Sequence, residues 1–245
     1  MADAKDPKEY LIVALDVQSK KEALEIVNKL RSDVSYFKVG LTLFAGEGPK
    51  IIDEIKKLGC KVFLDGKFLD IPHQVSGAVS SLVHHKVDMM NVHLTGGMHM
   101  LYDAKQAIIT TSKKLNIEPP KLLGVTALTS INEEILQENL QIKAQIDEYV
   151  LNRAKIAKEA GLDGIVCSPK EASLVRKELG KDFLIVTPGV RPKWAEKNDQ
   201  KRTSTPKEAV KNGANFVVVG RPITDAKDPL DAARKILSEI KEGIS

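Results

Sequence analysis

The chain has 245 residues, of which 42% are hydrophobic and 29% charged, and its formal net charge is +4. This composition is ordinary for a globular protein and excludes collagen-like, coiled-coil and disordered classes. The small positive excess does not indicate nucleic-acid or membrane binding, and no run approaches the roughly 18 apolar residues of a membrane span. We expect a single domain over residues 1–245, with a polar extension at 1–10.

The cellular location is predicted from the N-terminus and the cysteines. The opening sequence MADAKDPKEY lacks the apolar segment of a signal peptide and the Arg-rich, acid-poor character of a transit peptide. The two cysteines, Cys60 and Cys167, lie in apolar stretches, which favours reduced thiols over a disulfide. We therefore expect a cytoplasmic protein.

Eight short apolar runs, rich in β-branched residues, are predicted to be strands. They begin at Leu11, Tyr36, Lys61, Met89, Lys121, Gly164, Phe183 and Phe216. Each is followed by a segment with helical periodicity, and two helices are expected between the fifth and sixth strands, in INEEILQENL and IDEYVLNRAKIAKEAG.

Local signals mark where several helices begin and end. Ser19 with Glu22, and Thr205 with Glu208, have the spacing of capping boxes. The segment 49–59 opens with proline, closes with glycine and carries one apolar stripe. This stripe must lie against a sheet or another helix.

Eight strand–helix units predict an α/β fold, a (β/α)8 TIM barrel, because apolar strands need cover on both faces and the crossover helices supply it. An open doubly wound sheet is the alternative. That fold usually carries a G-x-G-x-x-G loop after its first strand, whereas LDVQSKKE follows here.

In such barrels the active site lies at the C-terminal ends of the strands. Polar residues stand at many of these ends: Asp16, Lys38, Asp65, Lys67, His93, Thr129, Ser130, Arg191 and Arg221.

The densest group is FLDGKFLDIP, residues 63–72. Asp65 and Lys67 are two apart, so both side chains point to the same face of a strand. Asp70 has the wrong parity and Pro72 argues that the strand has ended, so Asp70 reaches the site on a loop or serves another subunit. A surface ion pair is the simpler reading of Asp65 and Lys67 taken alone.

Lys38, one strand away, would place a second ammonium beside these acids. Four charges are costly to bury unless they neutralise one another or meet a ligand, so the group is a candidate site. The alternative for Lys38 is a lysine whose ammonium reaches solvent at the rim.

The last two strands indicate a phosphorylated substrate. Barrels frequently bind phosphate after strands seven and eight, where Gly220 permits close backbone approach and Arg221 supplies a fork of donors. The polar connection 189–205 is long enough to be a lid, or else a charged surface loop that holds Arg191 in solvent.

Metal and thiol chemistry are not predicted. No histidine spacing or carboxylate partner completes a metal-ligand set, and His93 is expected to be structural. Cys167 has no evident base beside it and is expected to be a core residue rather than a nucleophile.

Several of these segments occur together in one family. The chain resembles the orotidine 5′-monophosphate decarboxylases in ALD ending at Asp16, FKVG ending at Gly40, FLDGKFLDIP, VHLTGG from Val92, VTALTS from Val125, TPGVRP from Thr187 and VVGRPI from Val218. The order and spacing of DxKxxDIP and TPGVRP are highly specific, and the match covers nearly the whole chain.

The resemblance implies a role for each matching position. Lys67 would be the proton donor in a group of four charges that also includes Lys38, Asp65 and Asp70, and Asp70 would be lent by the partner of a homodimer. The implied substrate contacts are Asp16, Lys38, Asp65, Asp70, Ile71, Gln74, Thr129, Arg191, Gln200, Gly220 and Arg221, of which the last four residues hold the phosphate.

The implied reaction is decarboxylation of orotidine 5′-monophosphate to UMP in de novo pyrimidine synthesis, through a C6 carbanion and without cofactor or metal. A metal-dependent sugar-phosphate decarboxylase or aldolase of the same superfamily is a second hypothesis, which EDTA would distinguish. A non-catalytic barrel that binds a phosphorylated metabolite is a third, and it predicts binding without a change in orotate absorbance.

The chain departs from the family's frequent DLKFHDIPNT at Gly66, Leu69, His73 and Gln74. We expect Gly66 to point away from the barrel mouth and to cost about 0.5–1 kcal/mol of stability rather than chemistry. At position 74, the contact of a threonine with the partner's site is either absent or replaced by the Gln74 amide.

Overall fold

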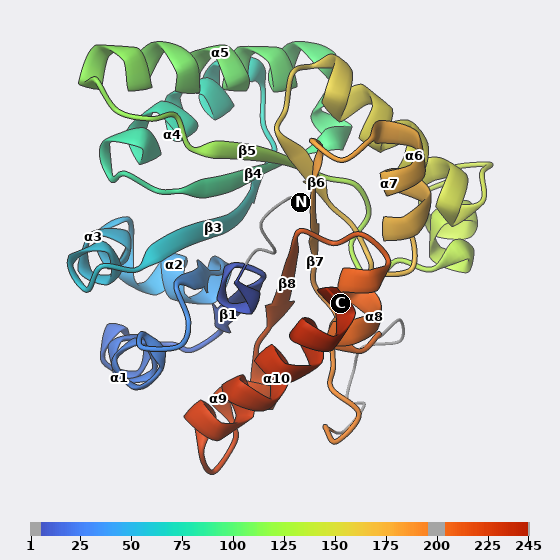
Figure 1. Cartoon of the computed structure of the whole chain (residues 1–245). Helices are drawn as coiled ribbons and strands as arrows, with labels where there is room; N and C mark the ends of the chain where they lie inside the picture. Colours follow the sequence, from blue (N-terminus) through green and yellow to red (C-terminus); the bar gives the residue numbers. More distant parts are fainter. Residues whose placement is uncertain (1–5, 196–203, 245) are drawn as a thin grey trace.

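The computed structural model describes residues 6–195 and 204–244. Its centre is a closed barrel of eight parallel strands in chain order, in which β8 pairs with β1 (Figure 1). The strands are β1 (Leu11–Leu15), β2 (Tyr36–Val39), β3 (Lys61–Phe68), β4 (Met89–His93), β5 (Lys121–Val125), β6 (Gly164–Val166), β7 (Leu184–Thr187) and β8 (Phe216–Val219). The predicted (β/α)8 barrel is confirmed, and the open sheet was the wrong alternative.

Helices surround the barrel (Figure 1). They are α1 (Lys20–Leu30), α2 (Leu41–Glu47), α3 (Lys50–Lys57), α4 (Pro72–His84), α5 (Gly97–Leu115), α6 (Ile146–Glu159), α7 (Ala172–Leu179), α8 (Pro206–Lys211), α9 (Arg221–Thr224) and α10 (Pro229–Ile244), with short turns η1 (Pro7–Glu9), η2 (Leu94–Gly96) and η3 (Ile135–Asn139). Between β5 and β6, α6 is the second predicted helix. The first is only the short π-helical turn η3.

The helix-start signals are confirmed in different degrees. Thr205 and Glu208 form the complete capping box of α8. At α1, the Ser19 hydroxyl accepts the Glu22 N–H at 3.3 Å. The Glu22 carboxylate accepts from the same hydroxyl at 3.2 Å rather than from the Ser19 backbone N–H. The turn after α3 places Gly59 at φ +80°, a conformation that favours glycine.

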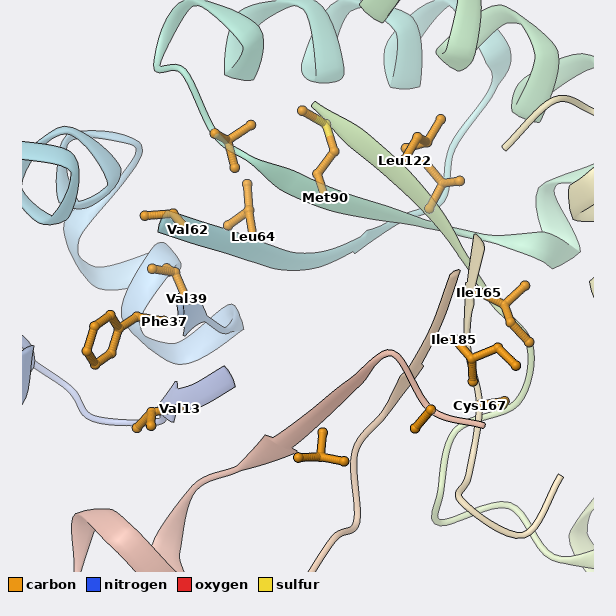
Figure 2. Packing of buried hydrophobic residues seen from close by; sticks show 14 of the residues in the cluster. Val13, Phe37, Val39, Val62, Leu64, Met90, Leu122, Ile165, Cys167 and Ile185 are labelled. Carbon is orange, nitrogen blue, oxygen red and sulfur yellow. The ribbon is translucent and has the colours of Figure 1, made fainter. Parts of the chain in front are cut away.

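Two apolar layers hold the barrel together. Side chains that point outward pack against the helices, as Phe37, Met90 and Ile185 illustrate (Figure 2). The inner cluster consists of Ile12, Ala14, Tyr36, Phe63, Met89, Leu123, Val125, Val166, Val186 and Val218. Because side chains alternate along a strand, the next inward positions toward the C-terminal ends belong to polar residues, among them Lys38 and Asp65.

Cys60 and Cys167 are both buried, and no disulfide joins them. Over residues 6–195 and 204–244, no helix combines the length and apolarity needed to cross a bilayer.

Candidate active site

Four charged side chains form one connected series at the C-terminal ends of β1, β2 and β3. The Lys38 ammonium donates to Asp16 at 2.8 Å and lies 3.5 Å from the second oxygen of Asp65. The Lys67 ammonium donates to the other oxygen of Asp65 at 2.8 Å. We call Asp16, Lys38, Asp65 and Lys67 the charged array; its two lysines and two acids balance in charge.

Asp65 is the centre of the charged array, with only 14% of its side chain exposed. Burial alone would raise the pKa of this carboxyl, but the charges of Lys38 and Lys67 and hydrogen bonds from Lys67 and Asn91 outweigh burial and hold the pKa below its ordinary value. Asp65 is therefore an anion at neutral pH, and its carboxylate lies between the ammonium groups of Lys38 and Lys67.

The backbone at Gly40 leaves room for the Lys38–Asp16 pair. A Cβ atom built at Gly40 would lie 2.9 Å from the Lys38 ammonium and 3.0 Å from the Asp16 carboxylate. Any side chain at position 40 would thus press on both members of the pair. Sequence reasoning assigned Gly40 only to a motif; its steric role follows from the structure.

Strand β3 is irregular where it carries Lys67. Its register with β4 shifts between Leu64 and Phe68, and Lys67 has φ +49°. The predicted meeting of Asp65 and Lys67 is confirmed, but a regular strand with simple alternation does not produce it.

This irregularity also corrects the expectation for Gly66. A Cβ atom there would lie 2.7 Å from the ring of Phe68, so the glycine leaves the space that this ring occupies. The absence of a side chain at Gly66 makes room for the Phe68 ring, so the glycine is not a simple loss of packing on a regular strand.

Asn91 is the polar residue of the site that sequence reasoning missed. It is fully buried in β4, and its side chain bonds both the Asp65 carboxylate and the backbone N–H of Lys67, each at 2.7 Å. One feature of the sequence could have identified it. Asn91 is an amide within the apolar run MMNVH, and it lies two residues before His93, so both side chains are expected on the same face of the strand.

Two cavities adjoin the charged array. The first has a volume of about 290 Å³ and is lined by Ala14, Asp16, Lys38, Asp65, Lys67, Pro188, Gly189, Val190, Arg191, Val218, Gly220, Arg221 and Pro222. The predicted Gly220, Arg191 and Arg221 thus lie together at the end of β7 and β8. With two arginines on its far side from β3, this cavity suits an anionic group.

The second cavity has a volume of about 270 Å³ and is mostly apolar. Its lining comprises Lys38, Phe63, Asp65, Lys67, Val125, Ala127, Leu128, Thr129, Ser130, Val166, Cys167, Pro188 and Val218. It shares five lining residues with the first cavity: Lys38, Asp65, Lys67, Pro188 and Val218. A ligand with an anionic end and a flat apolar end could therefore span both cavities and meet the charged array between them.

Near the two ends of the connection between β7 and α8, Val190 and Ser204 lie side by side. Val190 and Ser204 form a parallel bridge, and the N–H of Arg191 donates to the Ser204 carbonyl at 2.9 Å. Arg191 is 7% exposed, so the alternative of a solvent-held arginine was wrong. The predicted contact Gln200, and most of the predicted lid, lie outside the described residues.

Asp70, Ile71 and Gln74 do not line either cavity of their own chain. β3 ends at Phe68 and α4 begins at Pro72, as the proline predicted. Ile71 is 64% exposed, and the Asp70 carboxylate accepts the N–H of Ile71. These three exposed residues therefore lie outside the cavities that adjoin the charged array of their own chain.

His93 ends β4 and is half-buried, with its Nδ1 2.8 Å from the Thr95 hydroxyl. Burial, followed by the charges of Arg153 and Lys67, lowers the pKa of this imidazole. Among residues 6–195 and 204–244, no group of three His, Cys, Asp or Glu side chains is placed to hold a metal ion.

The fold and the site together define a TIM-barrel enzyme whose charged centre lies at the C-terminal face of the barrel. A model of the family described as "Orotidine 5'-phosphate decarboxylase / HUMPS family" matches residues 9–236. The chain belongs to this family, as its motifs predicted.

Individual relatives match over nearly their whole length. An orotidine 5'-phosphate decarboxylase of Syntrophomonas wolfei is 45% identical over 236 residues, 96% of this chain and 99% of the relative. One of Carboxydothermus hydrogenoformans is 47% identical over 236 residues, with 96% and 97% covered. The crystal structure of orotidine 5'-phosphate decarboxylase from Lactobacillus acidophilus matches with a TM-score of 0.84 at 38% identity, with 95% and 99% covered.

Proposed function

We propose that this carboxy-lyase converts orotidine 5′-monophosphate to UMP in pyrimidine biosynthesis without a cofactor, and that Lys67 protonates the C6 carbanion. The observation that carries the proposal is the Lys67 ammonium, held 2.8 Å from Asp65 at the wall shared by the two cavities. The full-length relatives that bear this name support the same substrate. Two buried cysteines that form no disulfide support the cytoplasm as its location.

The two cavities suggest how the nucleotide lies. The phosphate would meet Arg191, Arg221 and the backbone at Gly220 in the first cavity. The ribose hydroxyls would reach Asp16 and Lys38. The pyrimidine would enter the apolar cavity, with its polar edge at Thr129. Gln200 belongs to the proposed phosphate contacts by motif alone.

The chemical step needs a cation where negative charge develops. The bond between C6 and the carboxylate breaks, carbon dioxide leaves, and the electron pair stays on C6. The Lys67 ammonium stabilises that charge and then gives its proton to C6, leaving a neutral amine that water reprotonates. The Asp65 carboxylate, which accepts from the Lys67 ammonium at 2.8 Å, would hold that ammonium in position before the reaction.

The substrate phosphate lies far from the reacting carbon, so its binding energy serves catalysis indirectly. Contacts with a remote group can drive the ordering of a site that then favours the transition state. Arg221 and Arg191 would supply those contacts, and their loss should lower turnover efficiency more than folding.

A homodimer would explain why Asp70, Ile71 and Gln74 line neither cavity of their own chain. Large apolar side chains are exposed just before α4 and on α5, which packs against α4: Leu69 and Ile71 are 54% and 64% exposed, and Met98 and Tyr102, on one face of α5, are 38% and 54% exposed. A second copy placed on this surface would bury it and bring Asp70 to the partner's array.

The test of the function is the reaction itself. Purified protein mixed with orotidine 5′-monophosphate should convert it to UMP, followed by ultraviolet absorbance, at the same rate with and without EDTA. Loss of activity in EDTA, restored by a divalent metal, would instead support a sugar-phosphate type of enzyme. Nucleotide binding with no absorbance change would favour a non-catalytic barrel.

Mixing two inactive variants tests the shared site. Lys67→Ala and Asp70→Ala should each be inactive. If Asp70 serves the partner, a heterodimer contains one site with both residues intact, and an equilibrated equal mixture should recover about a quarter of wild-type activity by simple statistics of a two-fold dimer. If Asp70 serves its own chain, no site in the mixture is intact and no activity returns.

A further inference from the structure

Asn91 uses both ends of its amide on two neighbouring members of the site. Its Nδ2 donates to Asp65 Oδ1 at 2.7 Å, and its Oδ1 accepts the backbone N–H of Lys67 at 2.7 Å. The Lys67 ammonium donates to the same Asp65 oxygen at 2.8 Å. Asn91, Asp65 and Lys67 therefore form a closed ring of three hydrogen bonds, which we call the amide clamp.

The backbone of Lys67 needs such a partner. With φ at +49°, Lys67 adopts a left-handed conformation that costs a residue with a side chain about 1–2 kcal/mol. The regular pairing of β3 with β4 is interrupted between Leu64 and Phe68, so no ladder carbonyl of β4 takes the Lys67 N–H. The Asn91 side chain replaces that carbonyl and satisfies a buried donor that would otherwise be costly.

The surroundings of Asn91 make the clamp rigid. Asn91 is 0% exposed, and on the next strand it pairs with the buried Leu123. Its Cβ and amide therefore have little freedom to move, and both hydrogen bonds hold Lys67 against a fixed part of the barrel.

We propose that Asn91 is a positioning residue of the decarboxylase reaction, one that holds the backbone of Lys67 in its left-handed turn and orients Asp65, so that the ammonium is aimed at the reacting carbon. This inference rests on the proposed function. Asn91 does not line either cavity, so it acts through Lys67 and Asp65 rather than on the substrate.

The chemistry of the clamp requires one donor and one acceptor at a fixed separation. An alanine at position 91 offers neither. An ionised aspartate keeps the acceptor for the Lys67 N–H but sets a second carboxylate against Asp65. A protonated aspartate again offers an acceptor and a donor in the shape of the amide.

Asn91→Ala is the first test. We expect its kcat to fall by about 10²-fold, the usual effect of a displacement of about 1 Å in a catalytic group, with KM for the nucleotide changed far less. The matched control is Thr126→Val, directly after β5, which also removes a buried side-chain hydrogen bond, to the Val166 carbonyl at 3.0 Å. It should lower the melting temperature and leave kcat unchanged. A folded Asn91→Ala with wild-type kcat would overturn the proposal.

Asn91→Asp gives a readout that general destabilisation would not produce. The titratable groups around position 91 are Asp65 and Lys67 from β3, Lys38 from β2 and His93 on β4 itself. We expect the ratio of its kcat to that of the wild type to rise as pH falls from 8 to 5, because protonation of the new carboxyl restores the donor to Asp65. This test also decides the matter if Asn91→Ala does not fold. A folded variant whose ratio is flat over this range would refute the clamp.

A structural readout separates this inference from the proposed function. In a crystal structure of Asn91→Ala, Lys67 should leave φ near +49° and its ammonium should move from Asp65. In Asn91→Asp grown at pH 8, Lys67 should keep its φ, but the Asp65 carboxylate should turn away from position 91 and the ammonium should move with it. Unchanged geometry at Lys67 would contradict the inference even if the wild type is active. A wild-type protein with no decarboxylase activity would refute the function, while the clamp would still stand or fall by these coordinates.

Discussion

Replacement of Asp65 by asparagine should reduce both stability and activity, because one carboxylate serves two ammonium groups. Breaking a buried ion pair from one side costs about 3–5 kcal/mol. In Asp65→Asn, the Lys67 ammonium loses the carboxylate to which it donates. The Lys38 ammonium retains its hydrogen bond to Asp16 at 2.8 Å, so only one lysine is left without a carboxylate and we expect the lower end of that range. About 3 kcal/mol corresponds to a fall in Tm of roughly 6–12 °C for a chain of this size. Turnover should fall by about 10²–10³-fold, as when one electrostatic group of a catalytic site is removed.

The matched control is Asp163→Asn. Asp163 lies just before β6 and accepts from Lys105 at 2.6 Å and Lys121 at 3.4 Å, with 19% of its side chain exposed. Thermal unfolding followed by circular dichroism, together with the absorbance assay, should show similar losses of Tm in the two variants and loss of kcat in Asp65→Asn alone. Wild-type kcat in Asp65→Asn, or equal losses of kcat in both variants, would refute the reasoning.

The contribution of Asp65 to the free energy of unfolding should depend on pH in a definite direction. The pKa of Asp65 is lowered in the folded protein, so its contribution to stability is complete above the unfolded value of about 3.9 and is lost as pH falls through the folded pKa. The difference in unfolding free energy between wild type and Asp65→Asn should therefore be constant from pH 5 to 8 and shrink only in stronger acid. A difference that shrinks near neutral pH would contradict a lowered pKa.

Three further predictions concern other parts of the barrel. Arg221→Ala should lower kcat/KM for the phosphorylated substrate by about 10²-fold, the scale of a lost charge-assisted contact, and leave the slow reaction of the unphosphorylated nucleoside unchanged; equal effects on both would remove Arg221 from the phosphate site. Because the folded pKa of His93 is lowered, wild-type stability should decline as pH falls below about 6.5, and urea unfolding of His93→Gln should show a weaker decline; identical profiles would refute this. Gly164→Ala would place a Cβ against the Leu184 carbonyl and should cost about 1–3 kcal/mol in urea unfolding, with kcat retained in the folded fraction; unchanged stability would contradict the close approach of β6 and β7.

The eight strands could be predicted because each is an apolar run that is separated from the next by a helical pattern. The barrel also made the strand ends predictable, and with them the meeting of Lys38, Asp65 and Lys67. The alternation of side chains along a strand correctly predicted that Lys38 lies beside Asp65. The same alternation predicted the contact between Lys67 and Asp65, although the backbone at Lys67 is left-handed rather than that of a regular strand.

What the sequence left unpredicted depends on contacts between distant strands. Asn91 is one amide in an apolar run, and only the shifted register of β3 against β4 reveals that it replaces a backbone partner of Lys67. The roles of two glycines also depend on their neighbours in space: Gly40 leaves room for the Lys38–Asp16 pair, and Gly66 leaves room for the Phe68 ring. The π-helical turn at Ile135–Asn139 also departs from the helix that its apolar spacing indicated.

A crystal structure of the assembled protein with bound UMP tests the central claim most directly. The account predicts that the Lys67 ammonium lies within hydrogen-bond reach of the pyrimidine C6, at about 3 Å, while it keeps Asp65, and that Asp70 of the partner subunit completes the array. A Lys67 ammonium directed into solvent, with C6 facing another group, would contradict it.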